Sequence, residues 1–291
     1  MKPNPNQTPP PLEERIYSAH SRILHPRGLL NEMARDLWNS KELAWQLFRR
    51  DVSQRYRQSV LGILWVLVPP LVTTGIFVFL NSHKILNIEP TDIPYPVYVM
   101  LGTLLWQIFS ESVLAPLQAF NACVPIMTKI NMPREAPILA GMGQVLFYAS
   151  VQFLPALGIM IWSGVPLGPA ILLAPLAILI LMIQGMAVGL FLVPVGGLFR
   201  DINEGASLAL KLAFFLTPIV YPPPKEWPWS LLVSLNPVAP ILQGARDILT
   251  KGTLNDPITF WLISGGSLVA LLLALIFYRL AIPVVLERMG A

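Results

Sequence analysis

The sequence predicts an all-α integral membrane protein with six transmembrane helices, and three observations lead to this prediction. Of the 291 residues, 54% are hydrophobic and only 12% are charged, about half the charged fraction of a soluble domain. The apolar residues gather in stretches of about 20 residues, the length that crosses a bilayer as a helix. Lys and Arg are concentrated in alternate loops between these stretches, as expected when cytoplasmic loops retain positive charge.

The chain begins with a polar, proline-rich segment, which we expect to be a partly disordered cytoplasmic extension over residues 1–40. It lacks the apolar core of a secretory signal. Residues 41–59 then predict an amphipathic helix, with Leu43, Leu47 and Phe48 at helical spacing and arginines on the remaining surface. We expect this helix to lie in the membrane interface with its apolar side in the acyl region. A surface helix of a soluble subdomain is the alternative.

Hydropathy divides the rest of the chain, residues 60–291, into a six-helix transmembrane domain. Gly185 and Gly189 form a GxxxG pair, a spacing that allows close contact between membrane helices. After the fifth span, two apolar runs that are too short to cross a bilayer flank Asn236-Pro237. We expect two short re-entrant helices there, with a packed extracellular loop as the alternative. The expected spans are 60–80, 95–120, 137–162, 170–198, 205–221 and 258–282.

The positive charges in the loops predict that both termini lie in the cytoplasm. Ten Lys or Arg residues precede the first span, Lys129 and Arg134 follow the second, and Arg200 follows the fourth. The loop over residues 163–168, expected on the opposite side, carries no charge. The positive-inside rule therefore places the first set of loops in the cytoplasm. The single cysteine, Cys123, would lie at the cytoplasmic end of the second span and excludes an intrachain disulfide.

The residues do not indicate an enzyme. No Gly-Lys dipeptide occurs, so the chain lacks a GxxxxGK[ST] phosphate-binding loop. The histidines His20, His25 and His83 lack the spacing of metal ligands. Ionisable residues inside spans are then the default functional candidates, and we identify Glu111 and Lys211. Glu111 faces a cavity or makes a helix–helix hydrogen bond, and Lys211 lines a channel or reaches back to the interface. These residues indicate a transporter or channel subunit without its own energy source.

Short motifs follow one another along the six-span frame. They are Arg49-Arg50-Asp51, Arg55-Tyr56-Arg57-Gln58, Leu61-Gly62-Ile63-Leu64-Trp65, Met132-Pro133-Arg134-Glu135, Phe199-Arg200-Asp201, Thr217-Pro218-Ile219-Val220-Tyr221 and Leu235-Asn236-Pro237. In this order, over residues 41–291, they resemble the type-two ABC exporter permeases, the membrane subunits that export polysaccharides. The resemblance is strongest to the O-antigen and capsule permeases, with the teichoic-acid permeases as related proteins.

This resemblance implies a homodimer of the chain that works with two copies of a cytoplasmic ABC ATPase. ATP and magnesium would bind to the ATPase, whereas this chain would bind no cofactor, no metal and no nucleic acid. The substrate would be a lipid-linked polysaccharide exported across the bacterial inner membrane, and a small-molecule exporter of the same fold is the alternative. The loop over residues 121–137 would carry a short coupling helix that contacts the ATPase. The coupling residues would be Lys129, Met132, Pro133, Arg134 and Glu135.

Two further sets of residues are implied for the substrate. Arginines bind phosphate through paired hydrogen bonds, so those before the first span would receive a phosphorylated lipid anchor, unless they serve only as topology signals. These are Arg49, Arg50, Arg55 and Arg57. Aromatic rings can contact the apolar faces of sugars, although core packing or lipid contact is the alternative for each. The implied translocation path comprises Trp65, Phe77, Tyr98, Trp106, Phe109, Glu111, Lys211, Tyr221 and Trp227.

Overall fold

The computed structural model describes residues 35–57, 59–86, 88–129, 132–166, 168–199, 201–224 and 226–290. Within these ranges the regular structure is helical, without any strand. Apart from residues 35–40, the predicted extension lies outside the described part of the chain. His20, His25 and Arg200 lie outside it too.

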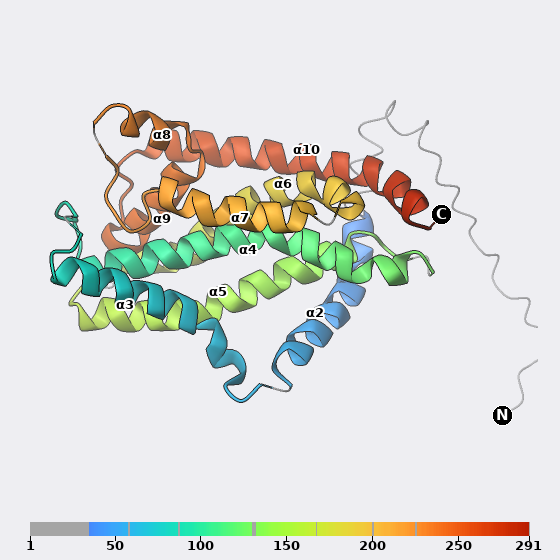
Figure 1. The fold of residues 1–291 in the computed structure, drawn as a ribbon, viewed down its shortest axis with the longest axis horizontal. Coiled ribbons are helices and arrows are strands. Elements are labelled where there is room, and N and C mark those ends of the chain that lie inside the picture. Colours follow the sequence, from blue (N-terminus) through green and yellow to red (C-terminus); the bar gives the residue numbers. More distant parts are fainter. Residues whose placement is uncertain are drawn as a thin grey trace, which may run out of the picture.

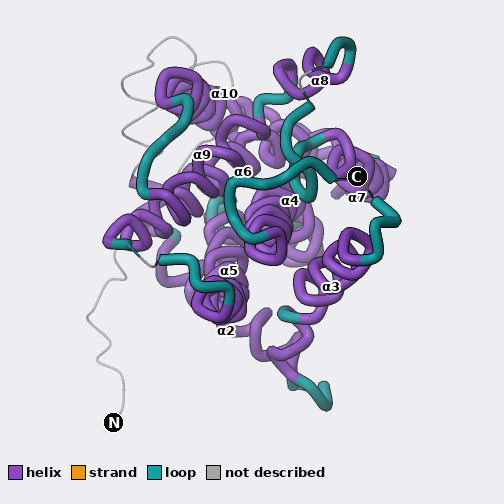
Figure 2. The backbone as a smooth tube through the Cα atoms, turned by 90° about the vertical axis from the view of Figure 1, so that its left-hand side faces the viewer, coloured by secondary structure: helices purple, strands orange, loops and turns teal. Residues whose placement is uncertain are grey.

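Helix α4 stands at the centre of the molecule, where α5 and α6 pack along it and α10 covers α6. Figure 2 shows α4 end-on, surrounded by the other helices. The two ends of α4 define the Tyr95 end and the Met127 end of the molecule, at the left and right of Figure 1. The elements are α2 (Lys41–Tyr56), the 3-10 helix η2 (Gly62–Val66), α3 (Val68–Ser82), α4 (Tyr95–Met127), α5 (Ala136–Trp162), the 3-10 helix η3 (Pro169–Leu173), α6 (Ala174–Leu198), α7 (Asp201–Leu216), α8 (Trp229–Leu235), α9 (Val238–Lys251) and α10 (Pro257–Gly290).

In the described part of the chain, four helices are long and apolar enough to cross a membrane. They are α4, α5, α6 with the end of η3 (together Ile171–Leu198), and α10, and they match the second, third, fourth and sixth predicted spans. The helices at the first and fifth predicted spans are shorter, because α3 has 15 residues and α7 has 16. At 1.5 Å per residue these helices are about 23 and 24 Å long, below the ~30 Å of a bilayer core.

Helix α7 ends at Leu216, earlier than the predicted span, which ran to Tyr221. Pro218 disfavours a helical conformation of the residue before it. The carbonyls of the next three residues then find donors on other helices, so the backbone can leave the helix without losing its hydrogen bonds. These bonds join Arg246 Nη2 to Ile219 O (2.8 Å), Tyr95 OH to Val220 O (3.1 Å) and Tyr98 OH to Tyr221 O (2.9 Å).

The segment after α7 forms two helices, α8 and α9, where two short re-entrant helices were predicted. Their position relative to the membrane stays a prediction. The second is longer than the apolar run 238–242 that predicted it, since it has 14 residues. Asn236 connects the two helices: its Oδ1 accepts the Val238 N–H (3.0 Å), and its Nδ2 donates to Thr217 Oγ1 (2.8 Å). The Asn-Pro motif therefore starts α9 and ties it to the end of α7.

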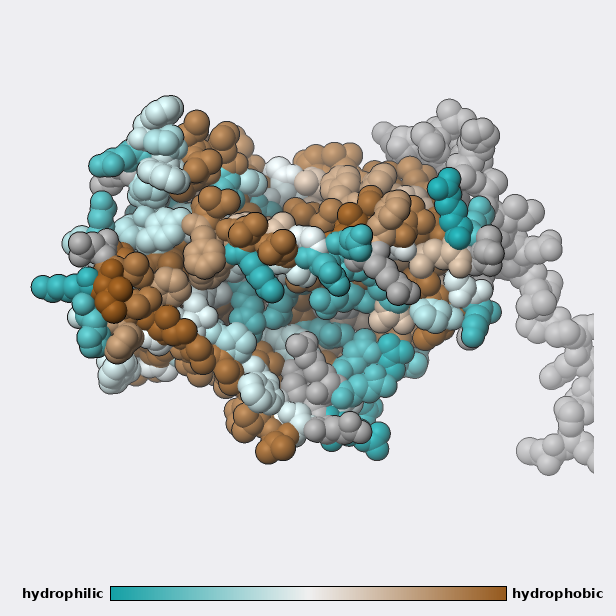
Figure 3. Space-filling model, in the orientation of Figure 1, coloured by the Kyte–Doolittle hydropathy of each residue, from teal (hydrophilic) through white to brown (hydrophobic). Residues whose placement is uncertain are grey.

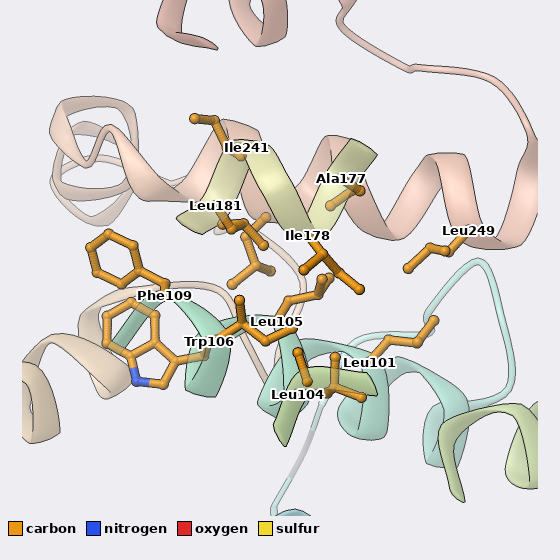
Figure 4. Close-up of a cluster of buried hydrophobic side chains, with 14 of the residues drawn as sticks. Leu101, Leu104, Leu105, Trp106, Phe109, Ala177, Ile178, Leu181, Ile241 and Leu249 are labelled. Carbon is orange, nitrogen blue, oxygen red and sulfur yellow. The ribbon is translucent and has the colours of Figure 1, made fainter. Parts of the chain in front are cut away.

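The GxxxG pair lies at the contact between α6 and α4, which confirms the predicted close approach. A Cβ at Gly185 would lie 2.6 Å from Phe109 O, and a Cβ at Gly189 would lie 2.4 Å from Val113 O. Larger residues would therefore force the helices apart. Next to this contact, side chains from α4, α6 and α9 form the main apolar cluster (Figure 4). Its labelled members are Leu101, Leu104, Leu105, Trp106, Phe109, Ala177, Ile178, Leu181, Ile241 and Leu249.

Helix α2 packs on α5 at the Met127 end. Ala44 and Leu47 are buried against Ala136 and Ala140 of α5. The apolar side that we expected to enter the acyl region is thus covered by protein, because the first turns of α5 present small residues to it. Trp45 lies on the exposed side of α2.

Candidate functional site

A polar groove of about 490 Å³ lies between α2, α4 and α5. Each of the three helices contributes two polar side chains: Asp51 and Gln54, Glu111 and Gln118, and Gln144 and Tyr148. Small residues leave space between them, namely Ala115, Ala119, Ala122 and Gly141.

The α4 side of this groove follows from helical spacing. Glu111, Ala115, Gln118 and Ala122 recur at three- and four-residue intervals, so they share one face of the central helix. The opposite face carries buried apolar residues such as Leu117. One helix that is apolar enough to cross a membrane therefore presents a polar stripe along part of its length.

Hydrogen bonds hold the carboxylates of the groove in place. Gln107 Nε2 donates to Glu111 Oε1 at 3.0 Å. Asp51 accepts from Gln144 Nε2 at 3.2 Å and from Arg50 Nε at 2.8 Å. The hydrogen bond to Asp51 raises the pKa of Arg50 above its usual value. The groove thus presents ordered polar groups to any molecule within it.

Apolar helices border this polar region on both sides. Figure 3 shows hydrophilic side chains gathered in the middle of the face that carries α3 and α7, between two hydrophobic bands. Large apolar side chains of both helices are exposed in the single chain. They are Leu71, Val72, Ile76 and Phe79 of α3, and Leu208, Leu212, Phe215 and Leu216 of α7.

Glu111 lines the groove, and the other predicted path residues lie elsewhere. Trp106 and Phe109 are buried, with 6% and 5% of their surface exposed, and pack against each other in the apolar cluster (Figure 4). Trp106 also contacts the ring of Phe214 on α7. In this arrangement these rings do not reach a molecule in the groove. Trp65, Lys211 and Trp227 are exposed, Phe77 and Tyr221 are half-buried, and Tyr98 is buried at the Tyr95 end.

A second polar cluster lies at the Tyr95 end, and the sequence analysis did not identify it. The guanidinium of Arg246, in α9, lies over the Tyr98 ring, 3.7 Å from its centroid, and is buried. Nearby, Lys251 pairs with Asp92 at 2.8 Å and with Asp247 at 3.3 Å. The hydrogen bond to Asp92 raises the pKa of Lys251 above its usual value. These contacts connect α9 to the loop before α4.

The predicted coupling loop is shorter than expected, because α4 continues to Met127. Of residues 128–135, positions 130 and 131 lie outside the described part of the chain. The other residues form turns and irregular backbone, and the described part of the loop contains no helix. Met132 packs against the cluster that joins α2 and α5, and Glu135 occupies the position before the first residue of α5.

Arg279 of α10 reaches this loop, and the sequence analysis overlooked it. It lies inside the predicted sixth span, so Glu111 and Lys211 are not the complete set of ionisable residues in the spans. Its Nη2 donates to Asp36 Oδ2 at 2.5 Å, and its Nη1 lies 3.9 Å from Glu135 Oε1. The adjacent Tyr278 donates to Arg134 O at 2.8 Å. A Tyr-Arg pair that interrupts an apolar run was the available signal.

The four arginines predicted to receive a lipid anchor lie on or just after α2. Arg49 and Arg57 are exposed, and Arg50 pairs with Asp51. The side chain of Arg55 lies outside the part of the chain that the structure describes. Among the described residues, no group of three or more His, Cys, Asp or Glu side chains could hold a metal ion.

Several long apolar helices, together with a polar groove on their shared surface, define a multi-pass helical membrane protein of the transporter type. Residues 42–250 match the family described as ABC-2 type transporter. The chain therefore belongs to this family, whose members are the membrane subunits of transporters.

Three relatives indicate which members the chain is similar to. It is 27% identical to the O-antigen export system permease protein RfbA of Myxococcus xanthus over 246 residues, which cover 82% of this chain and 92% of the relative. It is 27% identical to the protein of the same name from Klebsiella pneumoniae over 210 residues, 71% and 79% of the two chains. It is 25% identical to the polysialic acid transport protein KpsM of Escherichia coli over 243 residues, 80% and 91% of the two chains.

Proposed function

We propose that this chain is the membrane-spanning subunit of an ATP-driven exporter that moves a lipid-linked polysaccharide, of the O-antigen or capsular type, across the bacterial inner membrane. The names of the similar proteins support this substrate class, because they specify O-antigen export and polysialic acid transport. The observation that carries the proposal is the polar groove between α2, α4 and α5.

A polar groove beside apolar helices is costly if it faces lipid, since polar groups need hydrogen-bonding partners in hydrocarbon. Water and sugar hydroxyls are partners that both donate and accept hydrogen bonds. The side-chain amides and carboxylates of Gln118, Gln144 and Glu111 suit such partners. A long glycan also needs a continuous passage rather than a closed pocket, and a groove on an open face provides half of one.

A second copy of the chain would supply the other half. The exposed apolar side chains of α3 and α7 border the groove and are available for contact with a second copy. A two-fold axis through this face would bring the two grooves together and cover the apolar borders, consistent with the prevalence of closed symmetric dimers. The predicted path residues Trp65, Phe77, Lys211, Tyr221 and Trp227 would then lie along or near the passage.

The energy would come from a separate cytoplasmic ABC ATPase, which would bind ATP and magnesium, whereas this chain would bind no cofactor and hydrolyse no ATP. We place the Met127 end in the cytoplasm, together with both ends of the chain. The ATPase would contact the coupling residues Lys129, Met132, Pro133, Arg134 and Glu135.

The lipid anchor would arrive beside α2 from the inner leaflet. Arg49 and Arg57 are exposed there, and Arg50 and Arg55 belong to the same predicted set. Exposed Trp38 and Trp45 support an interfacial position for this part of the chain, because tryptophan is enriched at the level of the lipid headgroups. The guanidinium groups would bind the phosphate of the anchor by paired hydrogen bonds.

Ala122→Trp tests the groove as the passage. Ala122 is exposed on the α4 side of the groove, so the larger side chain would obstruct the groove without entering the core. An obstruction that raises the barrier by ~1.4 kcal/mol slows transport about tenfold. We therefore expect about tenfold less surface polysaccharide and retention of lipid-linked polymer inside, measured by immunoblotting of cell fractions.

Leu154→Trp is the matched control, since Leu154 is an exposed apolar residue of α5 that does not line the groove. It should leave export unchanged. Wild-type export by the Ala122→Trp variant would exclude the groove as the passage. Surface polysaccharide that persists after deletion of the gene would exclude the substrate class.

A further inference from the structure

The contacts of Arg279 connect three parts of the Met127 end that are distant in sequence. The guanidinium bonds to Asp36, which precedes α2, and lies beside Glu135, which precedes α5. Arg279 itself belongs to α10. The side chain of Arg279 is only 10% exposed, and those of Asp36 and Glu135 are 21% and 14% exposed. One largely buried cation thus holds two carboxylates from separate segments.

Tyr278 adds a second connection at the same place. Its ring is buried against Phe120 of α4, and its hydroxyl donates to the backbone carbonyl of Arg134 at 2.8 Å. The neighbouring residues Tyr278 and Arg279 therefore hold the backbone and a side chain of one short loop, at Arg134 and Glu135. A buried cation that loses its carboxylate leaves an uncompensated charge. Separating Arg279 from Asp36 and Glu135 is therefore energetically costly.

We propose that Arg279 is a positioning residue for energy coupling, which fixes the loop 132–135 to α10 and to the segment before α2. The inference rests on the proposed function, in which the ATPase contacts this loop. Movement of the loop can reach α5 through the peptide chain. Arg279 and Tyr278 provide a second, noncovalent route to α10, and Asp36 links the segment before α2 to the same guanidinium. Rigid contacts of this kind transmit a displacement between distant sites.

The experiment uses the full chain with its partner ATPase in proteoliposomes that contain lipid-linked polysaccharide. It measures the rate of ATP hydrolysis, the amount of polymer moved and the ratio of the two. Substitutions along coupling routes change coupling by roughly 2- to 30-fold, so Arg279→Gln should lower polymer moved per ATP at least about twofold. The complex should still assemble and hydrolyse ATP.

Arg288→Gln is the matched control, because Arg288 is an exposed arginine on the same helix. It removes the same charge and should leave the ratio unchanged. Hydrogen exchange should report faster exchange in the loop 132–135 of the Arg279→Gln variant than in the control, and Arg279→Lys should restore part of the ratio. An assembled Arg279→Gln variant with a wild-type ratio and wild-type exchange would overturn the proposal.

A second pair of variants applies if Arg279→Gln fails to fold. Glu135→Gln and Asp36→Asn each remove one partner and leave Arg279 with the other. Each should lower the ratio, and the double variant should lower it further. Wild-type ratios in both single variants would overturn the proposal. Failure of the proposed function is a separate outcome, since the wild-type complex would then move no polymer at all.

Discussion

At the scale of single residues, the position of Gly102 depends on the absence of a side chain. A Cβ there would lie 2.2 Å from Ile219 O and 2.4 Å from Arg246 Nη2. These are the two atoms that form the hydrogen bond after α7. Gly102 therefore allows Arg246 to reach the carbonyl that α7 leaves without a helical partner.

We expect Gly102→Ala to destabilise the protein, because the added methyl group would displace the Arg246–Ile219 bond. Overpacking of this kind costs about 1–3 kcal/mol, and it should appear as a lower unfolding midpoint in detergent. Gly158→Ala is the control, since Gly158 lies in α5, where the added Cβ would have no atom within 4 Å apart from its own helix backbone and chain neighbours. This control should be neutral or slightly stabilising because alanine favours helices. Equal stability of the two variants would contradict the close contact at Gly102.

Polar residues could be identified from the sequence, but the contacts that they make could not be predicted from it. Glu111 was identified from its place in a span, and it lines the groove. Arg246 and Arg279 were missed because their partners, Ile219, Asp36 and Glu135, are distant in sequence. Hydropathy shows that such a residue is polar, but the packing of the helices determines which groups it contacts.

At the scale of elements, the chain reversal after α7 depends on donors from other helices. The hydroxyls of Tyr95 and Tyr98, one helical turn apart on α4, hold the carbonyls of Val220 and Tyr221. Arg246 of α9 holds the carbonyl of Ile219. Two helices thus replace the hydrogen bonds that a continued α7 would have formed.

Tyr98→Phe should weaken this reversal, because it removes a hydroxyl donor but keeps the ring under Arg246. The loss of one such bond costs about 0.5–1.5 kcal/mol, measurable by thermal unfolding of the purified protein. Tyr221→Phe is the control, since the bond from its hydroxyl to Phe215 O is exposed and water can replace it. A larger loss for Tyr221→Phe than for Tyr98→Phe would contradict the importance of the partly buried bond from Tyr98.

The elements were predictable where the local pattern decides them. The long apolar runs predicted α4, α5, α6 and α10. Asp256-Pro257 marks the start of α10, because Asp256 Oδ1 accepts the N–H of Thr259 and caps the helix. The end of α7 was predicted too late, since the donors that allow the reversal come from α4 and α9. The apolar side of α2 was assigned to lipid because its contact with α5 cannot be read from periodicity.

At the scale of the whole molecule, the two ends differ in charge. The exposed or half-buried residues of the Met127 end include Lys129, Arg134 and Arg288. Among the described residues of the Tyr95 end, the exposed carboxylates of Glu89, Asp92 and Asp256 outnumber the exposed cations Lys84 and Lys251. The long helices α4 and α10 have 33 and 34 residues, or about 50 Å at 1.5 Å per residue. They therefore exceed a ~30 Å bilayer core, so the charged loops beyond their ends lie in the aqueous regions.

This asymmetry predicts the orientation, and the structure indicates where to test it. Cys123 is only 3% exposed, so it should not react with a maleimide in the folded protein and provides the background. Asp256→Cys and Glu287→Cys place exposed thiols at the Tyr95 end and the Met127 end. Because cytoplasmic segments retain Lys and Arg, a membrane-impermeant maleimide added to spheroplasts should label Asp256→Cys at once. It should label Glu287→Cys only after the membrane is permeabilised. The reverse pattern would place the coupling loop outside the cell, where no ATPase could reach it, and would contradict the proposed function as well as the orientation.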